Sequence, residues 1–400
     1  MKKIEDYLQP EKKGWTPHQI RQISDDRYLD SIGLFQKITE GWNRVVGMPY
    51  IIYMPEKDRV LMLVYLDYRP CKAVTMISND HGETWSEPRF VPQKQDEQSL
   101  GTNLMYLGGG KVMFCDHSNR WFSDDFGETW RSIPVQKDPS GKEWGGWQWE
   151  PGLIDRDPVT GKVTRLAETA FSHNGDEYPR PGYYSQAFIR FSYDEGKTWT
   201  PQTAVPQWKG INEVGLFRAA NRDIVAYCRM DINQWFRDAH HRRLGMHEPD
   251  LLTGFGISIS KDDGQTWSNV NPLFDHGRHF GSMVVMPNGD IVMSYMVRVS
   301  DGWNADGFPI YNIEALISRD HGATWDMEHR IILDEWTGNL RGACAWYSSP
   351  QSTSSVRLPD DSILTAYGRA AHCLPNPDGS NGPPRDIGIV RWNVPGCAKK

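Results

Sequence analysis

The sequence predicts an all-β fold made of repeated antiparallel units, and three observations support that prediction. An eight-residue pattern, Ser-x-Asp-x-Gly-x-Thr-Trp, occurs five times in the 400 residues. Short alternating or apolar runs, which are typical of β-strands, flank the copies. Almost no segment shows the periodicity of an amphipathic helix. Each copy of the motif is therefore expected at a hairpin turn between two strands.

The motif has a physical reason to form a turn. Its Asp carboxylate can accept backbone N–H groups across the turn, and its Gly adopts a positive φ without steric cost. Part of the motif also resembles a calcium loop, but only one acidic position is shared by all five copies, and calcium needs several carboxylates. We therefore predict structural turns remote from the functional site, with their acids at Asp80, Asp125, Asp194, Asp262 and Asp320.

The spacing of the motif predicts the number of units. The copies begin between Ser78 and Ser318 at a mean interval of 60 residues, which is the length of a four-stranded propeller blade with long loops. Six such units fit the chain and seven do not. After the last copy, strand-like runs remain at 354–358, 362–367 and 386–392. We expect a six-bladed β-propeller whose last blade is closed by an N-terminal strand between Trp15 and Thr39, which leaves no unpaired edge.

The same arithmetic predicts one domain over residues 1–400, in which segment 1–40 carries the closing strand and 41–400 the blades. Earlier strand pairs are expected at 50–53 with 60–65 and around 216 with 223–228, and a further hairpin turns at Asn288-Gly289. Six scattered cysteines, never in C-x-x-C pairs, indicate reduced thiols.

Composition limits the partners. The net charge is −7, from 44 Lys and Arg against 51 Asp and Glu, so the chain does not attract nucleic acid or an anionic membrane. A glycan or other small molecule fits better, and no cofactor or metal is indicated. The polar start has no signal-peptide pattern. We therefore expect a cytoplasmic location for the chain as written, and a secreted or periplasmic one if a signal has been removed. Nothing in the sequence fixes the oligomeric state.

The five copies of the motif are called Asp boxes below. Together with the expected six blades, they resemble the repeats of the sialidase (neuraminidase) superfamily, and the resemblance spans about Arg44 to Trp392. The boxes are specific for the fold and weakly specific for the activity. In sialidases a Glu and an Arg bracket one hairpin, and Asn212-Glu213 through Arg229 match that frame in spacing. The resemblance implies that Glu213 is the acid/base partner of the nucleophile. It also implies that Arg229 is one of three arginines binding the substrate carboxylate. The alternative is a surface Glu and a strand-end Arg.

The sequence departs from the family at the other two arginines. Gly47-Met48-Pro49 replaces the family's first-blade Arg-Ile-Pro, and the nearest cation is Arg44. The third arginine position falls near Tyr311, which leaves Arg298 at the preceding strand end as a substitute. A full carboxylate-binding triad therefore does not follow from the sequence.

The nucleophile position is also altered. Sialidases use a tyrosine paired with Glu, because the carboxylate on the anomeric carbon would repel an anionic nucleophile. Counting back from the Leu358-Pro359-Asp360 turn reaches Gln351, and Tyr347 lies further upstream. Two alternatives remain: a Tyr347 nucleophile, which gives retention, or a water positioned by Gln351, which gives inversion.

The proton donor to the leaving group is expected near the end of the first blade's second strand. Asp67 and Arg69 stand there. Further rim candidates for catalysis or substrate binding are Glu150, His279 and Arg369, although each alone is more often a structural residue.

Three functions follow from these features. The first is an exo-acting glycoside hydrolase of sialidase type, which releases a terminal sialic acid or related acidic sugar from glycoconjugates. The second is a propeller glycosidase or polysaccharide lyase for a uronic or neutral sugar, favoured by the missing Arg-Ile-Pro and the displaced tyrosine. The third is a non-catalytic glycan-binding propeller.

Overall fold

The computed structural model describes residues 14–24, 27–40, 42, 46–66, 71–92, 99–116, 118–137, 148–173, 184–232, 252–299, 310–337, 350–369 and 386–394. Regular structure in these ranges is β-strand, apart from the short 3-10 helix η2 (Pro55–Lys57) and a 3-10 residue at Leu252. The predicted all-β class is therefore confirmed. Within the same ranges, no helix has the length and apolar character needed to span a membrane.

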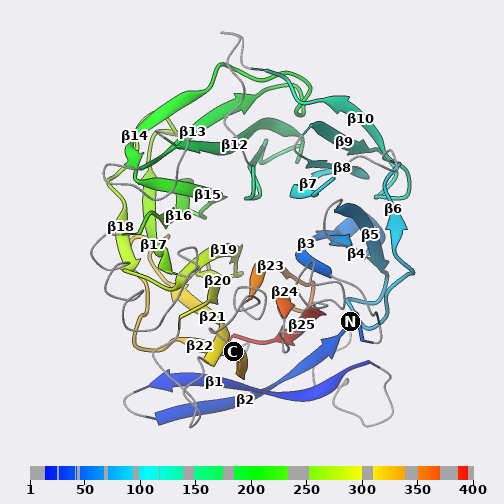
Figure 1. Ribbon diagram of the computed structural model, residues 1–400, viewed down its shortest axis with the longest axis vertical. Helices are drawn as coiled ribbons and strands as arrows, with labels where there is room; N and C mark the ends of the chain where they lie inside the picture. Colours follow the sequence, from blue (N-terminus) through cyan, green and yellow to red (C-terminus); the bar gives the residue numbers. More distant parts are fainter. Residues whose placement is uncertain are drawn as a thin grey trace, which may run out of the picture. The chain divides into compact units, whose positions relative to one another are not determined.

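The chain divides into two compact units, residues 99–280 and residues 1–98 with 281–400, and the division falls within β19. In residues 99–280, the described strands form three four-stranded antiparallel sheets, each following chain order (Figure 1). Such up-and-down sheets are the blades of a propeller-like arrangement. Their strands are β7 (Thr102–Gly108), β8 (Lys111–Cys115), β9 (Asn119–Ser123), β10 (Arg131–Pro134), β11 (Leu153–Arg156), β12 (Val163–His173), β13 (Ser185–Ser192), β14 (Thr203–Lys209), β15 (Ile211–Arg218), β16 (Ile224–Met230), β17 (Gly254–Ser260) and β18 (Asn271–Phe274).

The other unit holds one four-stranded sheet and most of a nine-stranded sheet with the order β19-β20-β21-β22-β1-β2-β25-β24-β23. The four-stranded sheet consists of β3 (Val46–Met54), β4 (Arg59–Leu66), β5 (Lys72–Ser78) and β6 (Arg89–Phe90). The larger sheet consists of β1 (Thr16–Ser24), β2 (Arg27–Lys37), β19 (Arg278–Val285), β20 (Ile291–Val297), β21 (Ile310–Ser318), β22 (Ile331–Thr337), β23 (Gln351–Arg357), β24 (Ile363–Arg369) and β25 (Asp386–Trp392).

The N-terminal segment completes the last group of strands, as predicted. β2 runs antiparallel to β25, with Leu34 opposite Arg391. The segment forms a hairpin of two strands, β1 and β2, instead of one strand. β1 also pairs with β22, through Arg21 and Gln22. β1 thereby covers a strand edge that would otherwise expose unpaired backbone groups. This second pairing joins two groups of four strands into one sheet, so the described strands form five sheets and not six separate ones.

Hydrogen bonds within the Asp boxes show why these segments turn. In the first box, Ser78 Oγ donates to Asp80 Oδ1 at 2.8 Å and accepts the Gly82 N–H at 2.7 Å. The Asp80 carboxylate also accepts the N–H and the hydroxyl of Thr84, at 2.9 and 2.6 Å. Gly82 has a φ of +88°. The same bonds recur in the other boxes, so the prediction of structural turns is confirmed.

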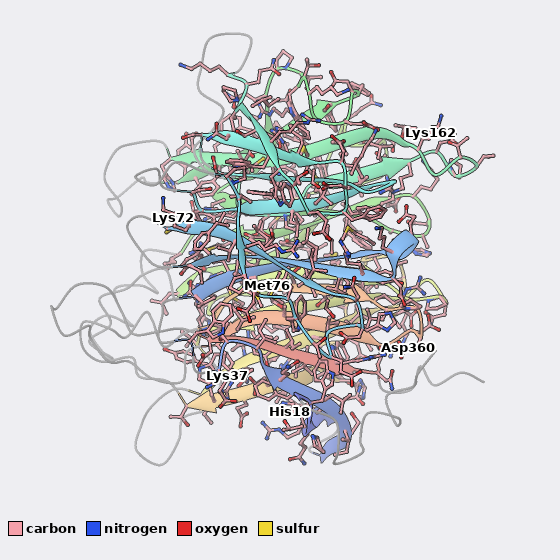
Figure 2. The ribbon with its side chains drawn as sticks, turned by 90° about the vertical axis from the view of Figure 1, so that its right-hand side faces the viewer. His18, Lys37, Lys72, Met76, Lys162 and Asp360 are labelled. Atoms are coloured by element: carbon pink, nitrogen blue, oxygen red, sulfur yellow. The ribbon has the colours of Figure 1, made fainter. Side chains whose placement is uncertain are left out.

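The Asp boxes lie at one end of the strands, and the segments that enter each first strand lie at the other end. Figure 2 shows Lys72, at the start of β5, and Asp360, in the turn between β23 and β24, on opposite sides of their unit. Met76 lies between the two ends and is 3% exposed. Because β5 runs from Lys72 into the first Asp box, the boxes lie at the end away from the segments that enter each first strand.

Candidate active site

Glu213 stands at the start of β15, where the strand is irregular. The ladder with β16 has a β-bulge between Ile211 and Val214, and bulges commonly re-aim side chains next to functional sites. Asn212 fixes this segment: its Oδ1 accepts the Glu213 N–H at 2.8 Å, and its Nδ2 donates to Asp231 Oδ1 at 2.9 Å. The backbone that carries Glu213 is therefore held by side-chain bonds.

Arg229, near the end of β16, joins Glu213 to two further residues. Its Nη1 lies 2.7 Å from Glu213 Oε1, and each of the two side chains is 10% exposed. Its Nε donates to Thr253 Oγ1 at 3.0 Å, and that hydroxyl lies 2.9 Å from His279 Nδ1. A continuous chain of polar contacts thus runs from Glu213 through Arg229 and Thr253 to His279.

Glu150 adds a second carboxyl group to the cluster. It precedes β11 and is 2% exposed. Its Oε2 accepts the hydroxyl of Tyr227, whereas its Oε1 is buried and has no hydrogen-bond partner. Burial and the charge of Glu213 raise the pKa of Glu150 well above its usual range, against the opposing effects of Tyr227 and Arg229. Glu150 therefore keeps its proton at pH values where an ordinary Glu has lost it.

Sequence reasoning missed Tyr227 and Thr253. Tyr227 reaches Glu150 because its ring lies over Gly215, where a Cβ would come within 1.9 Å of the Tyr227 Cζ. Only a glycine leaves that space. The available signal was the pattern Tyr-x-Arg at the end of a second strand, which recurs as Tyr367-Gly-Arg369.

Asp231, which follows β16, connects the cluster to β13 through hydrogen bonds. Asp231 accepts the N–H and the hydroxyl of Ser185, at 2.6 and 2.8 Å. The Ser185 hydroxyl lies 3.2 Å from His173 Nδ1, and burial lowers the pKa of His173. Because Asn212 also bonds Asp231, β13 and β15 are tied together at this end of the unit.

The predicted candidates fall into three groups. Glu150, Glu213, Arg229 and His279 lie in the cluster just described, within residues 99–280. Arg298, Gln351 and Arg369 lie in the other unit. The last group lies outside the described residues and comprises Arg44, Asp67, Arg69 and Tyr347.

The candidates of the other unit are occupied by internal contacts. Arg298 is 4% exposed and its Nε donates to the Pro350 carbonyl at 3.1 Å. Gln351, 4% exposed, is the first residue of β23. Arg369 Nε donates to Asp334 Oδ2 at 2.8 Å. In the part of the chain that the structure describes, no group of three or more His, Cys, Asp or Glu side chains is placed to hold a metal ion.

Comparisons with known proteins agree with the repeats and the fold. The family model for the BNR/Asp-box repeat matches residues 76–87. No relative is found among curated proteins. A protein of unknown function from Dyadobacter fermentans has a similar structure, with a TM-score of 0.64 and 15% identity over 94% of this chain and 99% of that one.

Two similar structures are glycoside hydrolases by name. The Hadza microbial sialidase Hz136 has a TM-score of 0.58 and 14% identity over 92% of this chain and 70% of that one. The GH93 α-L-arabinofuranosidase of Fusarium graminearum, in complex with arabinobiose, has a TM-score of 0.54 and 14% identity, over 94% and 98%. At these identities the likeness concerns the fold. The Asp-box repeats and this likeness together show a BNR-type, propeller-like fold similar to that of the two enzymes.

Proposed function

We propose that the chain is a glycoside hydrolase, built as a single six-bladed propeller, whose active site contains Glu150, Glu213 and Arg229. The observation that carries the proposal is a pair of neighbouring carboxyl groups held in different states. Glu150 is buried with a raised pKa, and Glu213 forms an ion pair with Arg229. Glycoside hydrolysis needs one carboxylic acid and one carboxylate at the same bond.

The two groups then have separate tasks. Glu150 donates its proton to the glycosidic oxygen as the bond from that oxygen to the anomeric carbon breaks. Glu213 accepts the proton of the attacking group. By the family resemblance that group is Tyr347, and the alternative is a water held by Gln351. Arg229 keeps the Glu213 carboxylate in place through its 2.7 Å contact.

The substrate proposed first is a terminal sialic acid or related acidic sugar, released by exo-acting cleavage. Its support is the Glu213 to Arg229 frame, which brings a guanidinium into the cluster. A guanidinium suits a carboxylate because its planar fork can donate two parallel bonds.

A neutral sugar is the second candidate, and a specific contact favours it. The charge of Arg229 is already balanced by Glu213, so a further carboxylate would compete for the same cation. The arabinofuranosidase of similar fold, bound to a neutral disaccharide, belongs to this second class by its name.

Hydrolysis of 4-methylumbelliferyl α-sialoside and α-L-arabinofuranoside tests both activity and substrate. We expect Glu213→Gln to lower turnover of the preferred substrate by about 100-fold or more, the scale of a positioned acid or base, while the protein still unfolds in one cooperative thermal transition. A matched control is Glu314→Gln, because Glu314 also pairs with a guanidinium, that of Arg330, at 3.6 Å. Near-wild-type turnover by Glu213→Gln would contradict the proposal. Binding of glycans without turnover would favour a non-catalytic propeller.

Leaving-group dependence tests the task of Glu150. If Glu150 protonates the leaving oxygen, Glu150→Gln should slow unactivated glycosides far more than 2,4-dinitrophenyl glycosides, whose leaving group needs no proton. An equal loss for both kinds of substrate would remove Glu150 from proton donation. Proton NMR of the first-formed anomer, combined with Tyr347→Phe, distinguishes the tyrosine nucleophile, which gives retention, from the direct attack of water, which gives inversion.

A further inference from the structure

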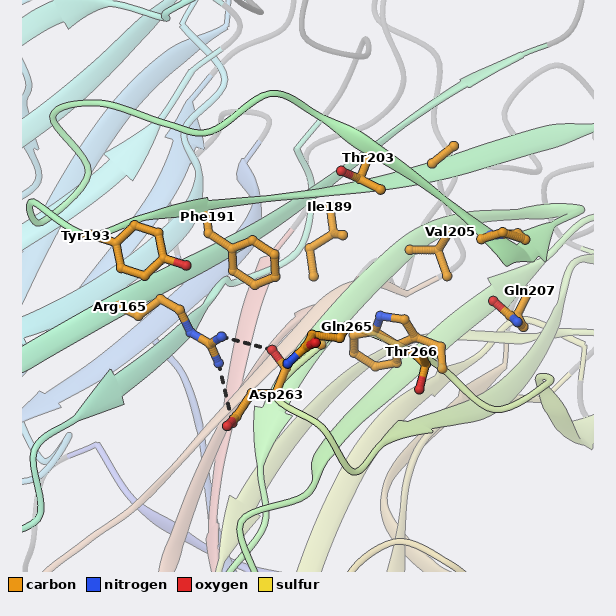
Figure 3. Close-up of a pocket in the computed structure, with 14 residues that line it drawn as sticks. Arg165, Ile189, Phe191, Tyr193, Thr203, Val205, Gln207, Asp263, Gln265 and Thr266 are labelled. Atoms are coloured by element: carbon orange, nitrogen blue, oxygen red, sulfur yellow. Dashed lines mark hydrogen bonds and ion pairs between the residues drawn. The ribbon is translucent and has the colours of Figure 1, made fainter.

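A groove of about 570 Å³ lies at the Asp-box end of residues 99–280, between β13 and β14 on one side and the box that follows β17 on the other (Figure 3). Its size is within the range of small-ligand sites. The groove is separate from the active-site cluster. Glu213 stands near the start of β15, whereas Arg218, the last residue of that strand, contacts Asp263 at the groove. Five residues of strand span about 17 Å.

The Asp-box repeat shows which groove residues are not needed for the turn. The second position of the box is polar in the four other copies, which carry Asn79, Asp124, Lys261 and Arg319. In the copy that follows β13 this position is Tyr193, and 67% of this residue is exposed. The turn forms equally well with polar residues, so its geometry does not require this aromatic ring. Figure 3 shows Tyr193 on one wall of the groove, beside Phe191.

Two planar amides line the groove away from Tyr193. Gln265 occupies the sixth position of the next box and is exposed, and Gln207 lies on the edge strand β14. Neither side-chain amide is bonded to another described residue. Their backbones are fixed, because Asp262 accepts the Thr266 N–H at 2.8 Å and β14 is hydrogen-bonded to β13. Rigid elements thus present free donors and acceptors.

The charges of the groove cancel. Arg165 Nη2 lies 2.6 Å from Asp155 Oδ2 and 3.6 Å from Asp263 Oδ1. Arg218 Nη1 lies 2.9 Å from the same Asp263 oxygen, so two arginines balance two aspartates. The Arg165 guanidinium also lies 5.0 Å from the Phe191 ring, so one face of that ring is covered. An exposed aromatic face, free amides and no net charge suit a neutral sugar, which offers an apolar ring face and hydroxyl groups.

We propose that this groove is a second, non-catalytic site that binds a neutral oligosaccharide. Tyr193 stacks on a sugar ring, and Gln207 and Gln265 bond its hydroxyl groups. The proposal does not depend on hydrolysis at Glu213, because the groove lies at the opposite end of the strands and is tested by binding alone.

The experiment is a ligand-observed NMR titration of the Glu213→Gln protein with neutral galacto-, arabino- and xylo-oligosaccharides, from tri- to pentasaccharides. We expect at least one series to bind, and Tyr193→Ala to weaken that binding about three- to tenfold, the effect of losing one aromatic contact. Gln265→Ala should act in the same direction. The matched control is Lys261→Ala, which changes the same box position in the neighbouring copy and does not line the groove.

Two results would overturn the proposal. One is that no oligosaccharide of the three series binds. The other is that binding stays unchanged in both Tyr193→Ala and Gln265→Ala, above all if Arg229→Ala abolishes it, because the sugar then occupies the active site. Equal losses of affinity for lactose and sialyllactose in Tyr193→Ala would support a neutral groove, and a preference for sialyllactose that disappears in Tyr193→Ala would contradict it.

Discussion

The ends of β16 and β24 carry the same pattern, Tyr-x-Arg, and use it differently. At β24 a single carboxylate serves both side chains: Asp334 Oδ2 accepts the Tyr367 hydroxyl and the Arg369 Nε, each at 2.8 Å. At β16 the tyrosine and the arginine each contact a different carboxyl group. Tyr227 donates to Glu150, and Arg229 pairs with Glu213.

The comparison teaches how one additional buried acid changes a structural contact. One Asp balances one Arg at β24, and the Arg369 guanidinium also packs 5.3 Å from the Trp336 ring. Those contacts favour a structural role for Arg369, which sequence reasoning had placed among the substrate-binding candidates. At β16 the acids outnumber the cation, so Glu150 retains a proton and an unbonded oxygen. Groups with perturbed protonation of this kind gather at functional sites.

Removing the acid at β24 should have the largest effect on stability. Asp334→Ala leaves Arg369 without its counter-ion and the Tyr367 hydroxyl without its acceptor, so we expect a loss of about 3–5 kcal/mol in the free energy of unfolding. Urea titration measures it. Turnover per folded molecule should stay near wild type. A loss below about 1 kcal/mol would mean that the β24 contact is not structural.

Exchanging the cation at β16 should have the next largest effect, and on activity. Arg229→Lys keeps the charge but loses the planar fork and the Nε bond to Thr253, so we expect kcat/KM to fall about tenfold, equivalent to about 1.4 kcal/mol. Steady-state kinetics on the preferred substrate measure it. Arg369→Lys is the control and should leave kcat/KM unchanged. Equal losses in both variants would remove the distinction between the two strand ends.

The tyrosines should differ by a smaller amount. Tyr367→Phe takes a donor from a charged, buried Asp334, whereas Tyr227→Phe takes one from a protonated Glu150. Hydrogen bonds to charged groups contribute more, about 1.5–3 against about 1 kcal/mol. We therefore expect Tyr367→Phe to be the more destabilising variant in urea titration. The reverse order would show that Glu150 is charged in the folded protein.

Local chemistry explains what could be predicted from the sequence. The boxes were predictable because Ser78, Asp80 and Thr84 bond one another within one turn. Glu213 and Arg229 were predicted as candidates because they bracket one hairpin with the spacing that the sialidase resemblance implies. The Glu150 to Tyr227 contact joins residues 77 positions apart, one in the segment before β11 and the other on β16, and no spacing rule encodes it. The pairing of β1 with β22 was missed for the same reason, since strand propensity does not name the partner strand.

The smallest expected effect is a change in how stability depends on pH. The pKa of Glu150 is raised in the folded protein, by burial and by the charge of Glu213. Between the ordinary Glu pKa of 4.5 and this raised value, the folded protein holds a proton that the unfolded chain has released. Stability from this group is therefore complete below pH 4.5 and declines as pH rises through the folded pKa.

Glu150→Gln carries no titrating proton, so its free energy of unfolding, measured by urea titration across this range, should fall less steeply with pH than that of wild type. The lowered pKa values of Asp125, Asp194, Asp262 and Asp320 do not obscure the result, because the contributions of these groups disappear only at more acidic pH, below their ordinary value of 3.8. If the slope of Glu150→Gln equals that of wild type, Glu150 is ionised in the folded protein, and the difference between the two strand ends does not lie in protonation.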